Sequence, residues 1–334
     1  MRIVVDAMGG DAAPKAPVEG ALLYDLETGG SDEVILVGDQ GAIEAELTHH
    51  KGPSPRNIRI IHASEVIDMH DAPTQAVRKK KDSSMVKGIA LIKTDEADGF
   101  VSAGSTGAQM AASLLTLGRV KGVQRPALGA FIPHEKGITL LIDVGANADC
   151  KPQHLSQFGL MGTIFMKYIY DVRDAKVGLL NIGEEKSKGN ELTLAAYEEM
   201  KAHLPNFVGN VEGRDVLAGH VEVVVTDGFT GNVLLKFAES IISMFGSQLR
   251  NSIKGNPMRM LGGLLIRNAF RDIKRTYNYE EYGGVPLLGV DGISIICHGS
   301  STAKAIKNAI HVARRMGEKK VNNHIEEELI AKGL

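Results

Sequence analysis

The residues of this sequence that are best suited to chemistry lie in polar, glycine-rich turns that follow predicted β-strands. One such turn comes after the β-branched run 221–226 and precedes an apolar run with helical spacing; its candidate residues are Asp227, Gly228, Thr230, Gly231 and Asn232. The free N–H groups and the dipole at a helix start favour anions, phosphate above all. Ligands of open α/β sheets also sit outside the carboxyl ends of the strands. We therefore expect this turn to bind a phosphate group.

A second turn of this kind lies within residues 97–117, between a predicted strand and an Ala- and Leu-rich helix. Its candidate residues for contact with phosphate or an acyl group are Gly104, Ser105, Thr106 and Gly107. Glycine lets the backbone come close to a ligand, and the two hydroxyl residues add hydrogen-bond donors. Serine and threonine are also ordinary helix N-caps, so a purely structural role is the alternative for them.

Three further predicted strands, within 138–142, 177–181 and 291–297, end in polar residues. The candidate side chains that follow them are Asp143 and Asn147, then Lys188 and Asn190, and finally His298, Ser300 and Ser301. We expect all of them to line one rim, where His298 and the serines assist a reacting carbonyl or a leaving group. The alternatives are a surface ion pair between Lys188 and Glu184, which is worth little energy, and a histidine that only packs.

Motifs that the sequence lacks limit the chemistry. There is no P-loop pattern, no GxGxxG at a strand end and no Gly-x-Ser-x-Gly elbow. Cys150 and Cys297 have neither metal-ligand nor disulfide spacing, and lone cysteines more often have a buried apolar role than a nucleophilic one. We therefore predict no metal and no cofactor. Attack of phosphate on an acyl thioester fits, because a thioester is already reactive and orientation with an oxyanion site supplies most of the rate.

Short β-branched strands that alternate with helical stretches must position these turns. The runs 2–7, 34–38 and 58–63 are the first examples. Such alternation is typical of a largely parallel sheet in the α/β class. No internal repeat or linker divides the 334 residues, so we expect a single domain over residues 1–334.

The bulk composition excludes several classes of function. The 38 basic and 40 acidic residues argue against a nucleic-acid-binding protein, which would be strongly basic. The absence of tryptophan and the scarcity of other aromatic residues argue against stacking on single-stranded nucleic acid. No signal-peptide stretch or transmembrane-length run is present. We expect a cytoplasmic protein with peripheral membrane association at most.

Residues 237–282 predict a helical hairpin that is broken at Gly255-Asn256-Pro257. The candidate surface residues of its second half are Arg259, Leu261, Leu264, Leu265, Arg267 and Arg271. Basic residues outnumber acidic ones seven to one between positions 250 and 275. A basic amphipathic helix suits an anionic membrane or an acidic protein partner. A dimer interface or packing on the core is the alternative. The basic run 78–81 is a further candidate surface, or simply a solvated helix face.

Six segments together give the sequence a family resemblance. They are DAMGGDAAP (6–14), SAGSTGA (102–108), LIDVGANADCKP (141–152), GLLNIGEEKSKGNEL (178–192), VTDGFTGNVLLK (225–236) and HGSS (298–301). In this order they resemble the bacterial phosphate acyltransferase (PlsX) family of phospholipid synthesis. Ser105 departs from the family pattern, which usually has asparagine there. Serine keeps a donor but shortens its reach, so we expect a weaker contact from Ser105 than from Thr106 or Gly107.

The resemblance implies an activity and an architecture. The family converts acyl-(acyl carrier protein) and inorganic phosphate into acyl phosphate, which a membrane acyltransferase passes to glycerol 3-phosphate. The implied fold is a three-layer α/β/α sandwich similar to that of phosphate acetyltransferases, assembled as a homodimer. The family's hairpin is implicated in peripheral attachment to the membrane.

These expectations combine into one hypothesis. Turns 104–107 and 227–232 would hold the phosphate, and Asp227, Asn232 and His298 would act in catalysis. The acidic carrier protein would dock on a basic surface. One alternative is a phosphate acetyl- or butyryltransferase that uses coenzyme A thioesters. Another is a non-catalytic, membrane-associated scaffold that binds the carrier protein.

Overall fold

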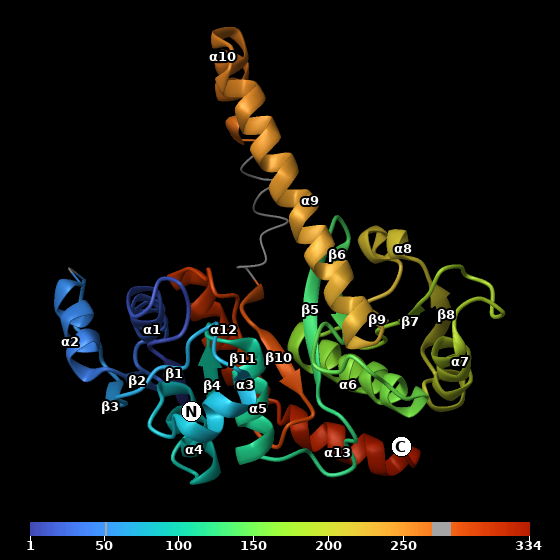
Figure 1. Ribbon diagram of the computed structural model, residues 1–334, viewed down its shortest axis with the longest axis horizontal. Helices are drawn as coiled ribbons and strands as arrows, with labels where there is room; N and C mark the ends of the chain where they lie inside the picture. The colour runs from blue at the N-terminus through green and yellow to red at the C-terminus, as the bar shows by residue number, and fades with distance from the viewer. Residues whose placement is uncertain (51, 269–281) are drawn as a thin grey trace.

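One eleven-stranded sheet runs through the computed structural model, which describes residues 1–50, 52–268 and 282–334 (Figure 1). Its order is β3-β2-β1-β4-β11-β10-β5-β6-β9-β7-β8. The strands are β1 (Arg2–Asp6), β2 (Glu33–Gly38), β3 (Ile58–His62), β4 (Gly99–Ser102), β5 (Ala127–His134), β6 (Gly137–Ile142), β7 (Val177–Leu180), β8 (Phe207–Val211), β9 (Val223–Val225), β10 (Val285–Leu288) and β11 (Ile293–Ile296). Every strand expected from the sequence is present, whereas β5, β8 and β10 were not predicted.

Strand β10 joins two sets of strands. Val285 and Pro286 pair with β11, while Leu287 and Leu288 pair with β5. The antiparallel pairings of the described strands are β10 with β11, β10 with β5, and β5 with β6. The other seven pairings are parallel, which confirms the mainly parallel sheet. An N-terminal set (β1–β4 and β11) and a C-terminal set (β5–β9) therefore share one sheet.

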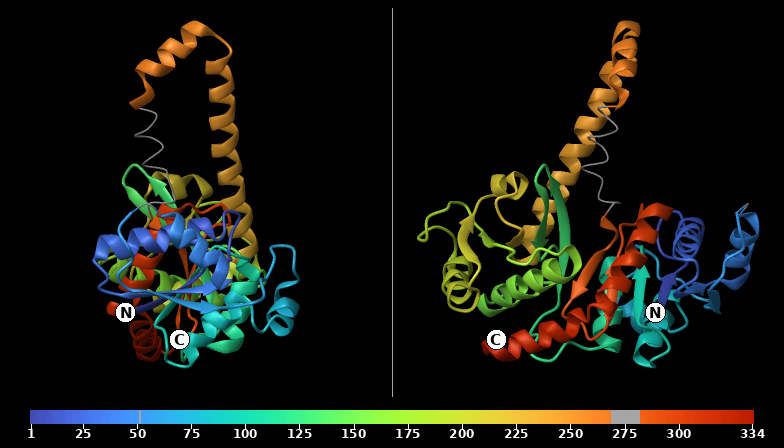
Figure 2. Two further views of the ribbon diagram at one scale, coloured as in Figure 1. Left: turned by 90° about the vertical axis from the view of Figure 1, so that its left-hand side faces the viewer. Right: turned by 180° about the vertical axis from the view of Figure 1, so that it is seen from behind.

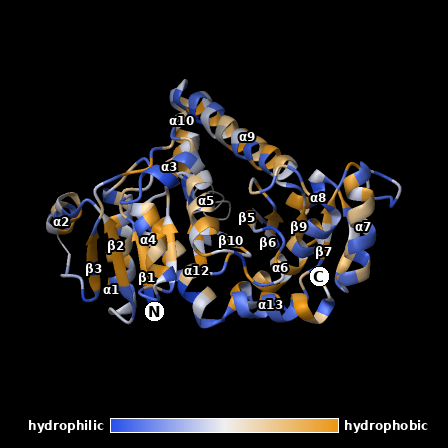
Figure 3. Ribbon diagram, turned by 60° about the horizontal axis from the view of Figure 1, so that its bottom comes forward, coloured by the Kyte–Doolittle hydropathy of each residue, from blue (hydrophilic) through white to orange (hydrophobic). Residues whose placement is uncertain are grey.

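Helices cover both faces of the sheet, which gives the expected three layers (Figures 1 and 3). Figure 3 shows largely apolar strands flanked by helices in which polar and apolar residues alternate. The helices are α1 (Lys15–Thr28), α2 (Gln40–His49), α3 (Pro73–Lys79), α4 (Ser84–Lys93), α5 (Thr106–Thr116), α6 (Pro152–Tyr170), α7 (Glu191–His203), α8 (Gly213–Ala218), α9 (Gly228–Lys254), α10 (Pro257–Leu265), α12 (Ala303–Glu318) and α13 (Val321–Lys332).

Alternation along the strands distributes the core between the two faces. Successive strand side chains point to opposite faces, so Ile3 and Val5 join one cluster and Val4 joins another. The first cluster is continuous along one face, beneath α1, α6, α12 and α13. The other face holds two separate clusters, one beneath α3, α4 and α5 and one beneath α8 and the beginning of α9.

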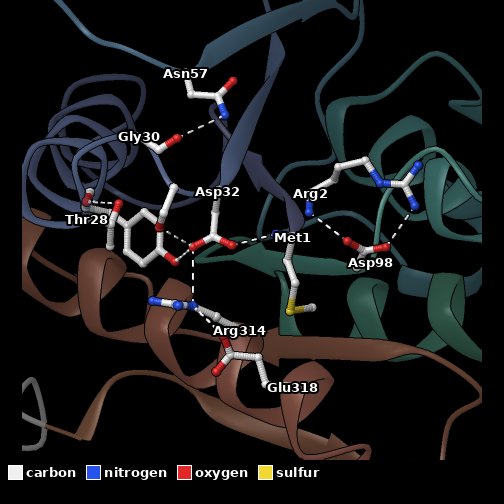
Figure 4. Close-up of polar contacts among 11 residues, drawn as sticks. Met1, Arg2, Thr28, Gly30, Asp32, Asn57, Asp98, Arg314 and Glu318 are labelled. Atoms are coloured by element: carbon white, nitrogen blue, oxygen red, sulfur yellow. Dashed lines mark hydrogen bonds and ion pairs between the residues drawn. The ribbon is translucent and has the colours of Figure 1, made fainter.

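The buried carboxylate of Asp32 fixes the first strands relative to the helices beside them (Figure 4). It accepts hydrogen bonds from the Met1 ammonium group at 2.5 Å and the Tyr24 hydroxyl at 2.8 Å, and it pairs with the Arg314 guanidinium at 3.3 Å. Burial alone would raise the pKa of Asp32, but these partners outweigh it and hold the pKa below the usual value. The network links β1, β2, α1 and α12.

Helices α9 and α10 project away from the body of the protein (Figures 1 and 2). Helix α9 begins at Gly228, nine residues before the predicted start of the hairpin, so it runs unbroken from the candidate phosphate turn to Lys254. The predicted break at Gly255-Asn256-Pro257 is confirmed, because the Asn256 side chain caps α10 by accepting from the Met258 N–H at 2.9 Å. Arg271 lies outside the described residues. Among the described residues, no helix is both long and apolar enough to span a bilayer.

Candidate active site

The turn predicted after strand 221–226 forms the start of α9, with Asp227 as its N-cap. One carboxylate oxygen of Asp227 accepts from the Thr230 N–H at 2.8 Å, and the other accepts from the Thr230 hydroxyl at 2.8 Å. Asp227 is half-buried and Thr230 is exposed. The carboxylate therefore stabilises the first turn of α9 while the pair still faces solvent.

Gly228 and Gly231 allow α9 to start against the loop that follows β6. A Cβ atom at Gly228 would lie 2.7 Å from the Asn147 carbonyl oxygen, and a Cβ atom at Gly231 would overlap the Asp143 carbonyl oxygen. The Gly228 N–H donates to the Asn147 carbonyl oxygen at 2.8 Å. These two glycines are therefore explained by close packing between the turn 227–232 and the loop 143–147.

Asp143 organises the loop 143–147 from within. It is completely buried, and its carboxylate accepts hydrogen bonds from the backbone N–H groups of Leu128, Gly145, Ala146 and Asn147 and from the Asn147 side chain. Burial raises the pKa of Asp143, against the opposing effect of these donors. Asp143, a candidate rim residue in the sequence, is fully buried here, and its carboxylate shapes the loop 143–147.

Asn147 and Asn232 also serve this loop. The Asn147 side-chain amide donates to the Pro126 carbonyl oxygen at 2.7 Å and to Asp143 at 2.9 Å. The Asn232 amide lies over Gly145, where a Cβ atom would sit 3.8 Å from it. Asn232 is half-buried. In this arrangement both amides contact protein at the back of the α9 turn.

A second group of loops gathers at the carboxyl ends of β1, β4 and β11. The Ser102 hydroxyl donates to the buried carboxylate of Asp6 at 2.6 Å and accepts from the Gly104 N–H at 2.9 Å. A Cβ atom at Gly9 would lie within 2.8 Å of Asp6, Ser102 and Gly104. The loop after β1 therefore packs tightly behind the turn 104–107.

That turn leads into α5 with an unusual start. Ser105 is the N-cap residue of α5 but makes no capping hydrogen bond with its side chain, and it is only 7% exposed. Thr106 is exposed and Gly107 is half-buried. The first N–H groups of a helix need an external partner, and the Ser105 side chain does not supply one here. The start of α5 therefore has the character of an anion site.

His298 lies in the loop that follows β11, next to the turn 104–107. Its Nδ1 shares a hydrogen bond with the Ser300 hydroxyl at 2.7 Å, and both residues are exposed. Ser301 is buried. The Gly299 carbonyl oxygen accepts from the Asp11 N–H at 2.8 Å, which ties the loop to the one after β1. Strands β4 and β11 are paired neighbours in the sheet, so the turn 104–107 and the loop 298–301 follow adjacent strand ends.

The two groups of loops share one face of the sheet. Met110 of α5 and Leu234 of α9 both pack against the hydrophobic cluster that contains Leu128, Leu287 and Ile296. Leu128 and Leu287 belong to β5 and β10, which lie between the two groups in the sheet order, and Ile296 belongs to the adjacent β11. Helices α5 and α9 therefore begin on the same side of the molecule, with the β10 region between them.

A pocket of about 590 Å³ adjoins the α9 turn. Its polar lining includes Asn181, Asn190, Thr193, Thr226, Asp227 and Thr230. Its apolar lining includes Leu155, Leu179, Ile182, Val233, Leu234 and Phe237. Three of the predicted site residues, Asn190, Asp227 and Thr230, line this pocket, whereas 104–107 and 298–301 do not. Thr193 and Thr226 were not among the predicted site residues, although Thr226 lies within the family segment 225–236.

Asn190 and Lys188 lie in the loop between β7 and α7. The Asn190 side chain caps α7 by accepting from the Thr193 N–H at 2.9 Å. Lys188 is exposed and does not line the pocket, but its carbonyl oxygen accepts from the Asn181 side chain at 3.0 Å. Lys188 thus contributes to the fold of the loop through its backbone, and its ammonium group remains at the surface.

The two cysteines are held as thiols. Burial raises the pKa of Cys150 to about 12, helped by the neighbouring charge of Asp143. Burial alone raises the pKa of Cys297 to about 12. A reactive cysteine needs a lowered pKa, so neither environment favours a nucleophile.

The fold and the polar strand ends define a class of protein. A phosphotransacetylase from Streptococcus pyogenes matches this structure with a TM-score of 0.63, over 95% of this chain and 94% of its own, at 19% sequence identity. A likeness at that identity shows the fold, which confirms the three-layer α/β/α architecture of the phosphotransacetylase type.

The sequence comparisons then give the family. A family model described as "Fatty acid synthesis protein" matches residues 1–324. A protein named phosphate acyltransferase from Pelotomaculum thermopropionicum is 49% identical over 333 residues, covering 98% of this chain and 95% of the relative. One of the same name from Desulfitobacterium hafniense is 50% identical over 334 residues, covering 98% of each chain. The chain belongs to this phosphate acyltransferase family and is an acyltransferase, as its motifs predicted.

Proposed function

We propose that this enzyme transfers a long-chain acyl group from acyl-(acyl carrier protein) to inorganic phosphate and releases acyl phosphate. The observation that carries the proposal is the start of α5, where Gly104 and Gly107 flank a helix N-terminus that the Ser105 side chain does not cap. Such N–H groups suit a phosphate dianion. The relatives' shared name, phosphate acyltransferase, supports the same reaction class.

The proposed reaction needs orientation and charge stabilisation more than a covalent intermediate. A phosphate oxygen attacks the thioester carbonyl carbon, so that a C–O bond forms and a tetrahedral oxyanion develops. The C–S bond then breaks, and the sulfur leaves as the thiol of the carrier protein, with the proton that the attacking hydrogen phosphate gives up. His298, with its hydrogen-bond partner Ser300, would assist the carbonyl or the leaving sulfur. Asp227 and Asn232 would act from the α9 side, and Asp227 would do so through the turn it caps.

The test is a reaction of the purified protein with inorganic phosphate and a choice of donors. We expect acyl phosphate, trapped as its hydroxamate, from palmitoyl-(acyl carrier protein), and at least tenfold lower kcat/KM with acetyl- or butyryl-coenzyme A. Equal or better turnover of the short coenzyme A thioesters would instead identify a phosphate acetyl- or butyryltransferase. No acyl phosphate with any active donor would reject the assignment and favour a scaffold.

The hairpin supports a further part of the proposal, which is peripheral contact with an anionic membrane. Its described tip exposes apolar side chains to an unusual degree, with Met258 and Leu265 each 79% exposed and Leu264 62% exposed. Arg259 and Arg267 are exposed beside them. Apolar and basic residues together suit an anionic lipid surface. The acyl phosphate would then be handed to a membrane glycerol-phosphate acyltransferase, with the enzyme working as a homodimer in the cytoplasm.

A further inference from the structure

We propose that the pocket between α7 and α9 holds the acyl chain of the donor and of the acyl phosphate product. This inference rests on the proposed function, because it assigns the pocket to the acyl part of that substrate. The pocket volume of about 590 Å³ falls within the range of ligand sites, which are mostly apolar with a few polar groups that fix orientation.

The pocket has a polar part at the start of α9 and an apolar part further along the same helix. Asp227 and Thr230 lie at the first turn of α9, whereas Val233 and Phe237 lie one and two turns further along the helix. One turn advances the helix by about 5.4 Å. A ligand with a polar head at the carboxyl end of β9 would therefore extend its apolar tail along α9.

Several of the apolar side chains that line the pocket are exposed to solvent. Ile182 is 82% exposed, Phe237 63% and Val233 56%, although each borders the pocket. Leu155 and Leu179 form buried wall opposite to solvent. Removing exposed apolar surface from water is favourable in proportion to the area covered. An alkyl chain would gain this energy without any polar partner.

The lining favours an acyl chain over the pantetheine arm of a thioester donor. Pantetheine carries two amide groups, which need hydrogen-bond partners when they are buried. Several polar side chains of the lining are already engaged within the protein: the Asn190 side chain accepts from the Thr193 N–H, the Asn181 side chain donates to Lys188, and the Asp227 carboxylate accepts from Thr230. We therefore assign the pocket to the methylene chain.

Gly213 offers a substitution that fills the pocket without disturbing the fold. It lines the pocket at the first position of α8, and a Cβ atom built there meets no heavy atom within 4 Å. Gly213→Leu should lower the ratio of kcat/KM for palmitoyl over butyryl donors at least tenfold. Gly213→Ala should lower the same ratio by less. Gly246→Leu is the matched control, because a Cβ atom at Gly246 also meets nothing within 4 Å and Gly246 lies outside the pocket.

Direct binding separates this inference from the proposed reaction. Decyl phosphate, used below its micelle concentration, should bind the wild-type protein and the Gly246→Leu variant alike, and at least tenfold more weakly to Gly213→Leu. Loss of this binding only in Gly213→Leu would support the pocket even if no donor gave acyl phosphate. An equal loss of turnover for every chain length, or unchanged decyl phosphate binding in Gly213→Leu, would overturn the assignment.

Discussion

The hydroxyl of Ser102 donates a hydrogen bond of 2.6 Å to the carboxylate of Asp6, joining the carboxyl ends of β1 and β4 directly behind the turn 104–107. The same hydroxyl accepts from the Gly104 N–H at 2.9 Å. Asp6 is only 3% exposed. A buried carboxylate thus sets the backbone position of the turn that we propose for phosphate.

The stability of the protein should depend on pH through Asp6. Burial raises the pKa of Asp6 above its ordinary value of about 4, although hydrogen bonds from Ser102 and Met8 act against this. Above pH 4 the unfolded chain loses this proton while the folded protein still binds it. The free energy of unfolding therefore falls as pH rises through the window between the two pKa values.

Asp6→Asn removes this titration. We expect its free energy of unfolding, measured with urea at several pH values, to have a slope that differs from wild type by at most about 1.4 kcal/mol per pH unit within that window. Ser102→Ala removes a bond that lowers the folded-state pKa of Asp6, so it should extend the upper end of the window to higher pH. Parallel profiles for Asp6→Asn and the wild-type protein would contradict the prediction.

Asp227 allows helix capping to be separated from chemistry. Asp227→Ala removes the acceptor for the Thr230 N–H and should cost about 1 kcal/mol of stability. Asp227→Asn keeps a capping oxygen and should cost a few tenths of that amount. If the carboxylate also acts on substrate, both variants lose at least tenfold in kcat. Wild-type kcat in the stable Asp227→Asn variant would restrict the residue to its capping role.

Gly231 should tolerate no side chain, because a Cβ atom there overlaps the Asp143 carbonyl oxygen. We expect Gly231→Ala to destabilise the protein by about 1–3 kcal/mol, the usual cost of overpacking. Gly246→Ala on the same helix is the control, since its Cβ atom meets nothing within 4 Å and alanine favours the helix. Denaturant unfolding measures both variants, and equal midpoints would show that α9 can move away from the loop.

The exposed leucines of α10 test the proposed membrane contact. Leu264→Glu combined with Leu265→Glu places two charges at the tip. This double variant should bind anionic vesicles at least tenfold more weakly than wild type, as measured by co-sedimentation. Turnover in vesicle-free solution should stay within twofold of wild type. Ile330→Glu combined with Val208→Glu, also at exposed apolar positions, is the charge-matched control. If the tip variant co-sediments with vesicles as well as wild type does, the proposed membrane contact is wrong.

Local signals in the sequence predicted much of the fold. The strands β1, β2, β3 and β11 are β-branched runs, and their alternation with helices identified the α/β class. The break between α9 and α10 could also be predicted from local residues, because Asn256 caps the second helix and Pro257 occupies its first position. The six motifs also identified the family, because they occur along the chain in the family's order.

The short β10 escaped prediction because a four-residue strand whose halves pair with different partners carries no periodicity of its own.

By itself, the sequence determined which residue types stand at the strand ends and which helices begin there, because turns and helix caps depend on residues that are close together in the chain. Only the tertiary structure decided which of those turns meet. It set the strands before 104–107 and 298–301 side by side, packed 143–147 against 227–232, and buried Asp143 where it holds a loop. The physical reason is that these contacts join residues far apart in the chain, where strand order and packing, rather than local propensity, set the neighbours.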